Sequence, residues 1–217
     1  MNSMPVPPSG PERRFSNALA WLSMLVLLIV APVAPADDPP PPEPPEAVVA
    51  SLEQQLIDNM RATDRDFDQR YALLRPMMDE IMAAARMARY IFGRDWREFE
   101  PEQRERFVEL FMDLSAATYA SQFDQYNNEE FAALEVQRQA DDRALVRRQL
   151  TTGSGREVAF DYLMTLDHGQ WRIVTIVTDG VSDLAMKRSQ YRRIVDEQGF
   201  DGLIRHLQEA VAKQREG

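Results

Sequence analysis

The sequence has no cysteine among its 217 residues and only two histidines. The missing cysteine excludes disulfides, thiol catalysis, cysteine-based zinc or iron–sulfur sites and a lipidated N-terminal cysteine. His168 and His206 have no His or Cys neighbour at metal-ligand spacing. We therefore interpret both as solvated surface residues and expect no metal and no other cofactor.

Recognisable catalytic motifs are also missing from the sequence. There is no Gly-rich phosphate loop and no HExxH. Gly180 and Ser182 form a Gly-x-Ser sequence, but Leu184 stands where a nucleophile elbow has its second glycine. Ser182 is better explained as a helix N-cap. Asp161 is the one acid expected at a strand centre, on the face away from the core, so the pattern predicts no enzyme.

Basic residues are scarce relative to acidic ones. The chain has 25 Lys plus Arg against 35 Asp plus Glu, a net charge of −10. This balance argues against nucleic-acid binding, which rewards a basic face, and against passive adsorption to anionic lipid. The 44% hydrophobic content excludes a disordered acidic tail and permits a sizeable core.

Proline is almost absent beyond residue 45, since 12 of the 14 prolines lie in residues 1–45. Within this leader, two arginines precede an apolar run over 18–30, and an Ala-Pro-Ala site ends at Ala36. Basic flank, short apolar run and small-residue site are the parts of a secretory signal peptide. We expect residues 1–36 to be removed on export, with an uncleaved membrane anchor as the alternative.

The segment after the predicted cleavage site reads DDPPPPEPP over residues 37–45. Such a run favours an extended polyproline conformation and predicts a tether. Residues 46–217 are then a single folded domain. Because residues 1–36 hold two arginines and one glutamate, the mature chain has a net charge of −11.

The predicted domain begins with helical periodicity. Apolar residues recur at steps of three or four over 47–63, and again from Pro101 to about residue 126. Between them we expect a short helix over 68–75, stopped by Pro76, and a longer one over 77–92.

After residue 128 the period changes from 3.6 to 2. Four strands are predicted, over residues 134–140, 145–151, 156–166 and 171–178. Their short turns make neighbouring strands antiparallel. Helices return at 183–198 and from residue 201. The order predicts an α+β fold: a four-stranded antiparallel meander with helices before and after it packed on one face.

The inward stripes of this fold are rich in methionine and aromatic residues. A solid core and an apolar cavity both require such stripes, and methionine lines adaptable apolar sites well. Periodicity does not separate the two, so the pattern leaves both open.

Three segments together carry a family resemblance. They are ARYIFGRDWR leading into PEQRERF (88–107), GQW leading into DGVS (169–182), and MKRSQY leading into GFDGLI (186–204). Their order and spacing resemble the MlaC, or toluene-tolerance, family over about residues 47–210. The resemblance implies a curved antiparallel sheet and helices that enclose an apolar pocket for acyl tails.

The resemblance also implies a function. Family members are periplasmic carriers that ferry phospholipid between an outer-membrane lipoprotein complex and an inner-membrane MCE-domain ABC transporter. For this chain it implies a monomeric, non-enzymatic shuttle with phospholipid as cargo. Thr175 and Asp183 depart from the family pattern, which has Asp and an apolar residue there. A carrier of a hopanoid or sterol is therefore one alternative. An enzyme on a similar cone-shaped fold and an interaction protein with a solid core are two others.

Stripes and resemblance together select twelve candidate lipid-binding residues. Nine are predicted to face the acyl tails: Met82, Met87, Phe92, Phe107, Phe111, Phe123, Phe160, Tyr162 and Met164. Three are predicted nearer the rim of the pocket: Trp171, Val181 and Met186.

Overall fold

The computed structural model describes residues 42–216. The predicted signal peptide and most of the predicted tether lie outside these residues. The described elements are, in chain order, α1 (Pro45–Arg61), α2 (Phe67–Ile81), α3 (Ala84–Phe92), the 3₁₀ helix η1 (Asp95–Arg97), α4 (Pro101–Gln122), β1 (Glu130–Ala140), β2 (Arg143–Thr151), β3 (Glu157–Asp167), β4 (Gln170–Thr178), β5 (Val181–Ser182) and α5 (Asp183–Glu216). Among them, every helix is too short or too polar to cross a bilayer.

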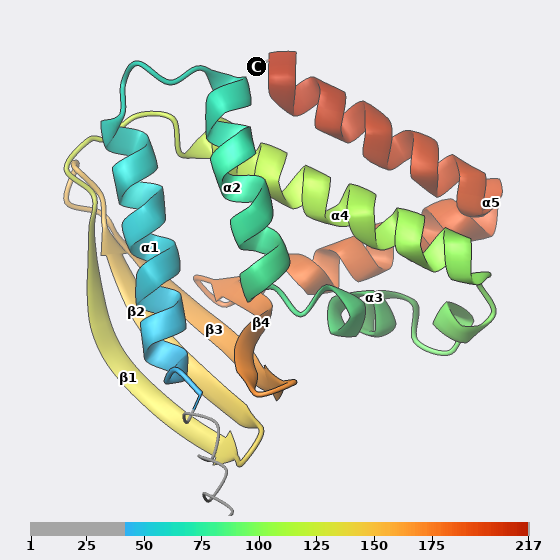
Figure 1. Cartoon of the computed structure of the whole chain (residues 1–217), viewed down its shortest axis with the longest axis horizontal. Helices are drawn as coiled ribbons and strands as arrows, with labels where there is room; N and C mark the ends of the chain where they lie inside the picture. The colour runs from blue at the N-terminus through green and yellow to red at the C-terminus, as the bar shows by residue number, and fades with distance from the viewer. Residues whose placement is uncertain (1–41, 217) are drawn as a thin grey trace, which may run out of the picture. The chain divides into compact units, whose positions relative to one another are not determined.

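The strands form one antiparallel sheet in the order β1-β2-β3-β4-β5. The first four are the predicted meander, and the two-residue β5 pairs with the end of β4. Figure 1 shows a curved sheet with α1 along its inner side and the other helices beyond α1 on that side. The predicted α+β fold is confirmed, with five strands in place of four.

Two prolines begin helices. Pro101 is the first residue of α4, as predicted, and Pro45 is the first residue of α1. The tether prediction was therefore wrong at its last position. Proline suits the first helical position because its missing N–H has no intrahelical partner there and its φ is already helical.

The predicted boundary between the second and third helices was wrong. Pro76 lies inside α2, and the break comes later, at Met82 and Ala83. Met82 is extended (φ −92°, ψ 137°) and forms a parallel bridge with Ile173 of β4. The Ala83 N–H donates to the Ile173 carbonyl at 2.8 Å. These contacts with β4 hold the chain extended at Met82, so helix 77–92 is interrupted where it touches the sheet.

The two predicted C-terminal helices meet without an intervening loop. They form α5, whose helical dihedrals are broken only at Gly199 (φ 68°, ψ −178°). Glycine adopts a positive φ without the Cβ clash that other residues suffer. The chain therefore bends at Gly199, close to the predicted stop.

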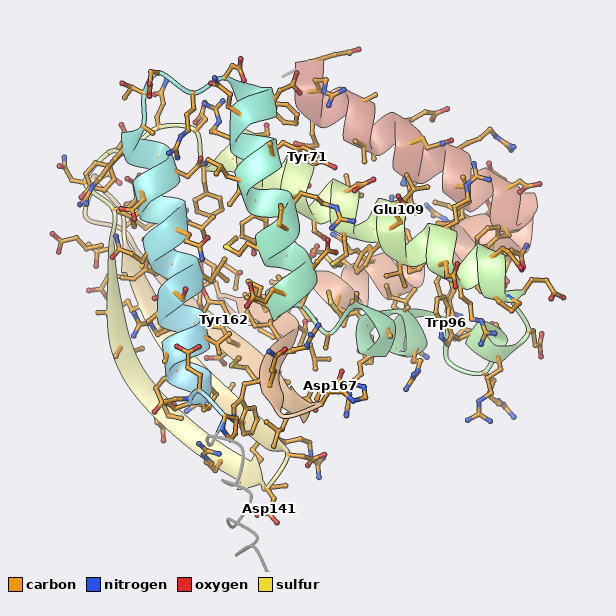
Figure 2. The ribbon with its side chains drawn as sticks, in the orientation of Figure 1. Tyr71, Trp96, Glu109, Asp141, Tyr162 and Asp167 are labelled. Carbon is orange, nitrogen blue, oxygen red and sulfur yellow. The ribbon has the colours of Figure 1, made fainter. Side chains whose placement is uncertain are left out.

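An aromatic cluster fills the core where α3, η1 and the start of α4 meet. Phe92 and Phe107 pack edge to face with ring centroids 4.9 Å apart, and Trp96 stacks on Phe92 at 5.9 Å. Figure 2 labels Trp96 at this end of the domain and Tyr162 at the sheet beneath α1. Edge-to-face and offset-stacked contacts are the preferred aromatic geometries, so this end is densely packed.

Candidate functional site

A cavity of about 350 Å³ lies between α4, β4 and the first turns of α5. Helix α4 contributes Phe111, Leu114, Ser115, Thr118, Tyr119 and Gln122; β4 contributes Ile173, Thr175, Ile176 and Thr178; and α5 contributes Asp183, Leu184 and Lys187. Met82, Met87, Phe123 and Phe160 complete the lining. Most of the wall is therefore hydrocarbon.

Helix α4 lines the cavity along one stripe because its lining residues are three or four positions apart. Two of them are small polar residues whose hydroxyls are satisfied inside the helix. Ser115 donates to the Phe111 carbonyl at 2.8 Å, and Thr118 donates to the Leu114 carbonyl at 2.7 Å. With these hydroxyl hydrogens used, the stripe offers space to an apolar ligand without demanding a polar partner.

Strand β4 lines the cavity with an irregular pattern. Its pairing with β3 shifts by one residue, since Leu163 pairs with Thr175 but Met164 pairs with Ile173. Such a bulge lets Ile173 and Ile176 both reach the cavity although they are three residues apart. The Met82–Ile173 bridge brings Met82 to the same wall.

Five of the twelve predicted site residues line this cavity: Met82, Met87, Phe111, Phe123 and Phe160. The structure brings these together from α3, α4, β3 and the residues that directly follow α2 and α4. Their contact with lipid stays a prediction.

The other seven predicted residues lie outside the cavity lining. Phe92 and Phe107 belong to the aromatic cluster. Tyr162 and Met164 are buried in the core, and Trp171 lines a separate groove with α1 and α2. Val181 and Met186 are 53% and 55% exposed. An inward stripe does not say which part of the interior is empty, so the stripe alone could not assign these seven to a cavity, and their contact with lipid stays a prediction.

The lining residues that the sequence did not single out come from the second half of α4, from β4 and from the start of α5. Leu114, Ser115, Thr118 and Gln122 continue the spacing of Phe111 along the same helix face. That spacing is a readable signal, but small and polar residues on it were not taken as pocket residues. The lining of β4 had no such signal, because the bulge breaks its alternation.

The charged groups of the cavity lie at the start of α5. The Lys187 ammonium donates to both carboxylate oxygens of Asp183 at 2.8 Å. Beside them, the hydroxyls of Thr175 and Ser182 lie 3.3 Å apart. Burial, with a smaller contribution from Asp183, raises the pKa of Tyr119, so its phenol stays neutral at physiological pH. The cavity thus has an apolar body and one charged end.

A buried ion pair between α1 and β2 lies outside the cavity lining. Glu53 of α1 is 2% exposed, and Arg148 of β2 donates to it through Nε at 2.8 Å. Tyr162, whose ring stacks on Phe160, donates its hydroxyl to Glu53 at 3.4 Å. Burial raises the pKa of Glu53, while the hydrogen bond and charge of Arg148 lower it, and burial dominates. The pair joins α1 to the sheet.

The described residues contain no cluster of three or more His, Asp or Glu side chains that could hold a metal ion. His168 lies exposed in the β3–β4 turn with φ 49°. His206 is partly buried, and its Nε2 lies 3.1 Å from the Gln190 amide nitrogen.

Comparisons with known proteins agree with this geometry. The family model for the MlaC protein matches residues 47–209. The intermembrane phospholipid transport system binding protein MlaC of Haemophilus influenzae is 24% identical over 128 residues, a match that covers 57% of this chain and 59% of that protein. The toluene tolerance protein ttg2D of Pseudomonas putida is 21% identical over 159 residues, covering 71% of this chain and 74% of that protein.

The fold also recurs among solved structures. A phospholipid-binding protein from Ralstonia solanacearum, solved in complex with a phospholipid, superposes with a TM-score of 0.68 at 20% identity, covering 79% of this chain and 99% of that one. Because the family model spans most of the sequence, from the first described helix into the last, this chain belongs to the MlaC family.

Proposed function

We propose that this protein is a non-enzymatic periplasmic carrier that holds the acyl tails of a phospholipid in the cavity between α4 and β4. The observation that carries the proposal is the apolar cavity itself, found in a chain of the MlaC family. The name of the Haemophilus influenzae relative supports it, since that name describes intermembrane phospholipid transport, and the structural relative was solved with a phospholipid.

The energetics of lipid transfer explain why a carrier needs such a cavity. A diacyl phospholipid has on the order of 30 tail methylenes, each worth ~0.8 kcal/mol when removed from water, or ~20 kcal/mol in total. The bilayer supplies the same stabilisation, so the carrier must match the membrane. The cavity lies at the lower end of the usual range of ligand pockets. We expect Met82 and Met87 to repack as the tails enter, because methionine adapts its shape easily.

The cellular setting completes the proposal. The predicted signal peptide would deliver the chain to the periplasm, and the absence of cysteine leaves no site for a lipid anchor. We propose that it exchanges lipid with an inner-membrane MCE-domain ABC transporter and an outer-membrane lipoprotein complex. With a mature net charge of −11, docking would depend on these protein partners and not on anionic lipid surfaces.

Mass spectrometry of lipid that co-purifies with the exported protein tests the proposal directly. We expect diacyl phospholipid in roughly stoichiometric amount. A bound hopanoid or sterol would support the carrier function but show that the cargo is not phospholipid. Protein that returned no lipid, and took none up from phospholipid vesicles, would overturn the proposal. The solid-core alternative already fits the structure less well, because it predicts no cavity.

A matched pair of substitutions on α4 tests the location. Thr118→Phe places a ring in the cavity, whereas Glu109→Phe adds the same ring at an exposed position of the same helix, labelled in Figure 2. Overpacking an occupied site costs ~1–3 kcal/mol, so Thr118→Phe should lower bound lipid about ten-fold. Glu109→Phe should retain it. Circular dichroism checks that both variants fold, and equal lipid content in the two would contradict this location.

A further inference from the structure

A second groove adjoins the charged end of the cavity, between α4 and α5. This groove, of about 440 Å³, shares the lining residues Leu114, Thr118 and Lys187 with the cavity. Its other walls carry mainly polar side chains: Gln190, Tyr191, His206, Glu209, Lys213 and Gln214, together with Ala210. An apolar cavity next to a polar groove matches the two-part character of a lipid.

The cations of this groove differ from those of the rest of the chain. Of the 25 basic residues, 23 are arginine and only two, Lys187 and Lys213, are lysine. Both lysines line the groove, as does one of the two histidines, His206. Lysine is a compact charge with three rotatable donors, and it pairs with phosphate without a fixed planar geometry.

Lys187 lies at the junction, since it lines both the cavity and the groove. Its side chain is 22% exposed, and its one ion-pair partner among the described residues is Asp183, whose side chain is 63% exposed. The two are i and i+4 on α5, an arrangement worth only a few tenths of a kcal/mol at a surface. An anion arriving from the cavity side therefore meets an ammonium that is held weakly.

We propose that Lys187 binds the phosphodiester of the lipid, and that the headgroup then lies in the α4–α5 groove. This rests on the proposed function, because it places the acyl tails in the cavity. Lys213 adds a second positive charge to the groove, while the carboxylates of Asp183 and Glu209 repel a second negative charge. The arrangement selects lipids that carry a phosphate over neutral lipids with the same tails.

The test is a competition between two lipids that differ only in the phosphate-bearing headgroup. The protein, stripped of lipid, is loaded from non-ionic detergent micelles holding equal amounts of phosphatidylethanolamine and diacylglycerol with identical acyl chains. Bound lipid is then quantified by mass spectrometry. A charge-assisted hydrogen bond supports about a ten-fold preference for the phospholipid in the unchanged protein.

Three variants test whether the charge of Lys187 causes the preference for phospholipid. Lys187→Met keeps an unbranched, apolar side chain but removes the charge, and it should reduce the preference to about one-fold. Asp183→Asn removes the competing carboxylate and should maintain or raise the preference. Arg205→Met removes a charge from an exposed position on α5 outside both lining sets, and it should change nothing.

The outcomes separate the two proposals. If the unchanged protein binds neither lipid, the carrier function itself fails. If it binds both equally, or if Lys187→Met keeps the preference, the carrier stands and the headgroup site is overturned. The headgroup site would also be overturned if Asp183→Asn lowered the preference for phospholipid as far as Lys187→Met does. The preference would then depend on the intact ion pair and not on the lysine charge.

Discussion

The first half of α4 packs into the aromatic cluster, whereas its second half lines the cavity. The first half presents Phe107, which is fully buried and packs against Phe92 and Trp96. The second half presents Ser115 and Thr118 to the cavity. The helix is continuous, so the difference comes from side-chain volume. Large rings close one end of the domain, and small side chains on the same helix leave the other end open.

Phe111 marks the border between these regions. Its ring stacks on Phe107 at 5.5 Å, and it also lines the cavity. Phe111 therefore lies between the aromatic cluster and the cavity. Its ring offers a ligand an apolar contact and no polar group.

Removing a ring from the densely packed end should have the largest effect on stability. Phe107→Ala deletes a fully buried aromatic side chain, and such changes cost ~3–5 kcal/mol through lost burial and the void left behind. Chemical denaturation measures this as a lower unfolding midpoint. Lipid bound per folded molecule should stay close to that of the unchanged protein. A loss below 1 kcal/mol would mean that this end is not close-packed.

Removing a ring from the cavity end should have the opposite result: a small loss of stability and a large loss of bound lipid. Phe123→Ala deletes a partly buried ring that stacks on Tyr119 and lines the cavity. Because the ring already borders empty space, we expect a loss of only about 1 kcal/mol. Retained lipid, measured by mass spectrometry after dilution, should fall several-fold. If Phe123→Ala destabilised the fold as much as Phe107→Ala, this would contradict the conclusion that the aromatic end is packed more densely than the cavity end.

The sequence predicted the layout of the domain well because periodicity and chain breakers are local signals. The change of period after residue 128 located the meander, and Gly199 was placed near the bend in α5. The boundary at Pro76 was wrong because a tertiary contact decided it. The bridge from Met82 to Ile173 links residues 91 positions apart, and no local pattern reports such a pairing.

The candidate site was less predictable for a related reason. Phe107 and Phe111 are equivalent on the helix stripe, yet only Phe111 reaches the cavity. Which inward residue borders a void depends on the volumes of all its neighbours, including Ser115 and Thr118. The position of the charged groups was equally unpredictable from the sequence. Lys187 has the sequence context of an ordinary surface residue, and only the structure places it at the cavity.

The smallest expected effect concerns the buried pair of Glu53 and Arg148, which joins α1 to the sheet. Burial raises the pKa of Glu53 in the folded state, while the unfolded chain keeps the ordinary value of about 4.3. Below that value Glu53 is protonated in both states. As pH rises through the raised pKa, the folded state has bound more protons than the unfolded state, so the contribution of Glu53 to stability falls.

Comparison with Glu53→Gln isolates this group, because all other carboxylates titrate in both proteins. We expect the free energy of unfolding of the unchanged protein, minus that of Glu53→Gln, to decrease from pH 4 to pH 7. Urea denaturation at several pH values measures this difference. An increase over the same range would mean that Arg148 outweighs burial and holds the carboxylate charged. In that case an ion pair would stabilise the contact between α1 and β2. The aromatic end of the domain would then depend on packing alone, and this contact on charge as well.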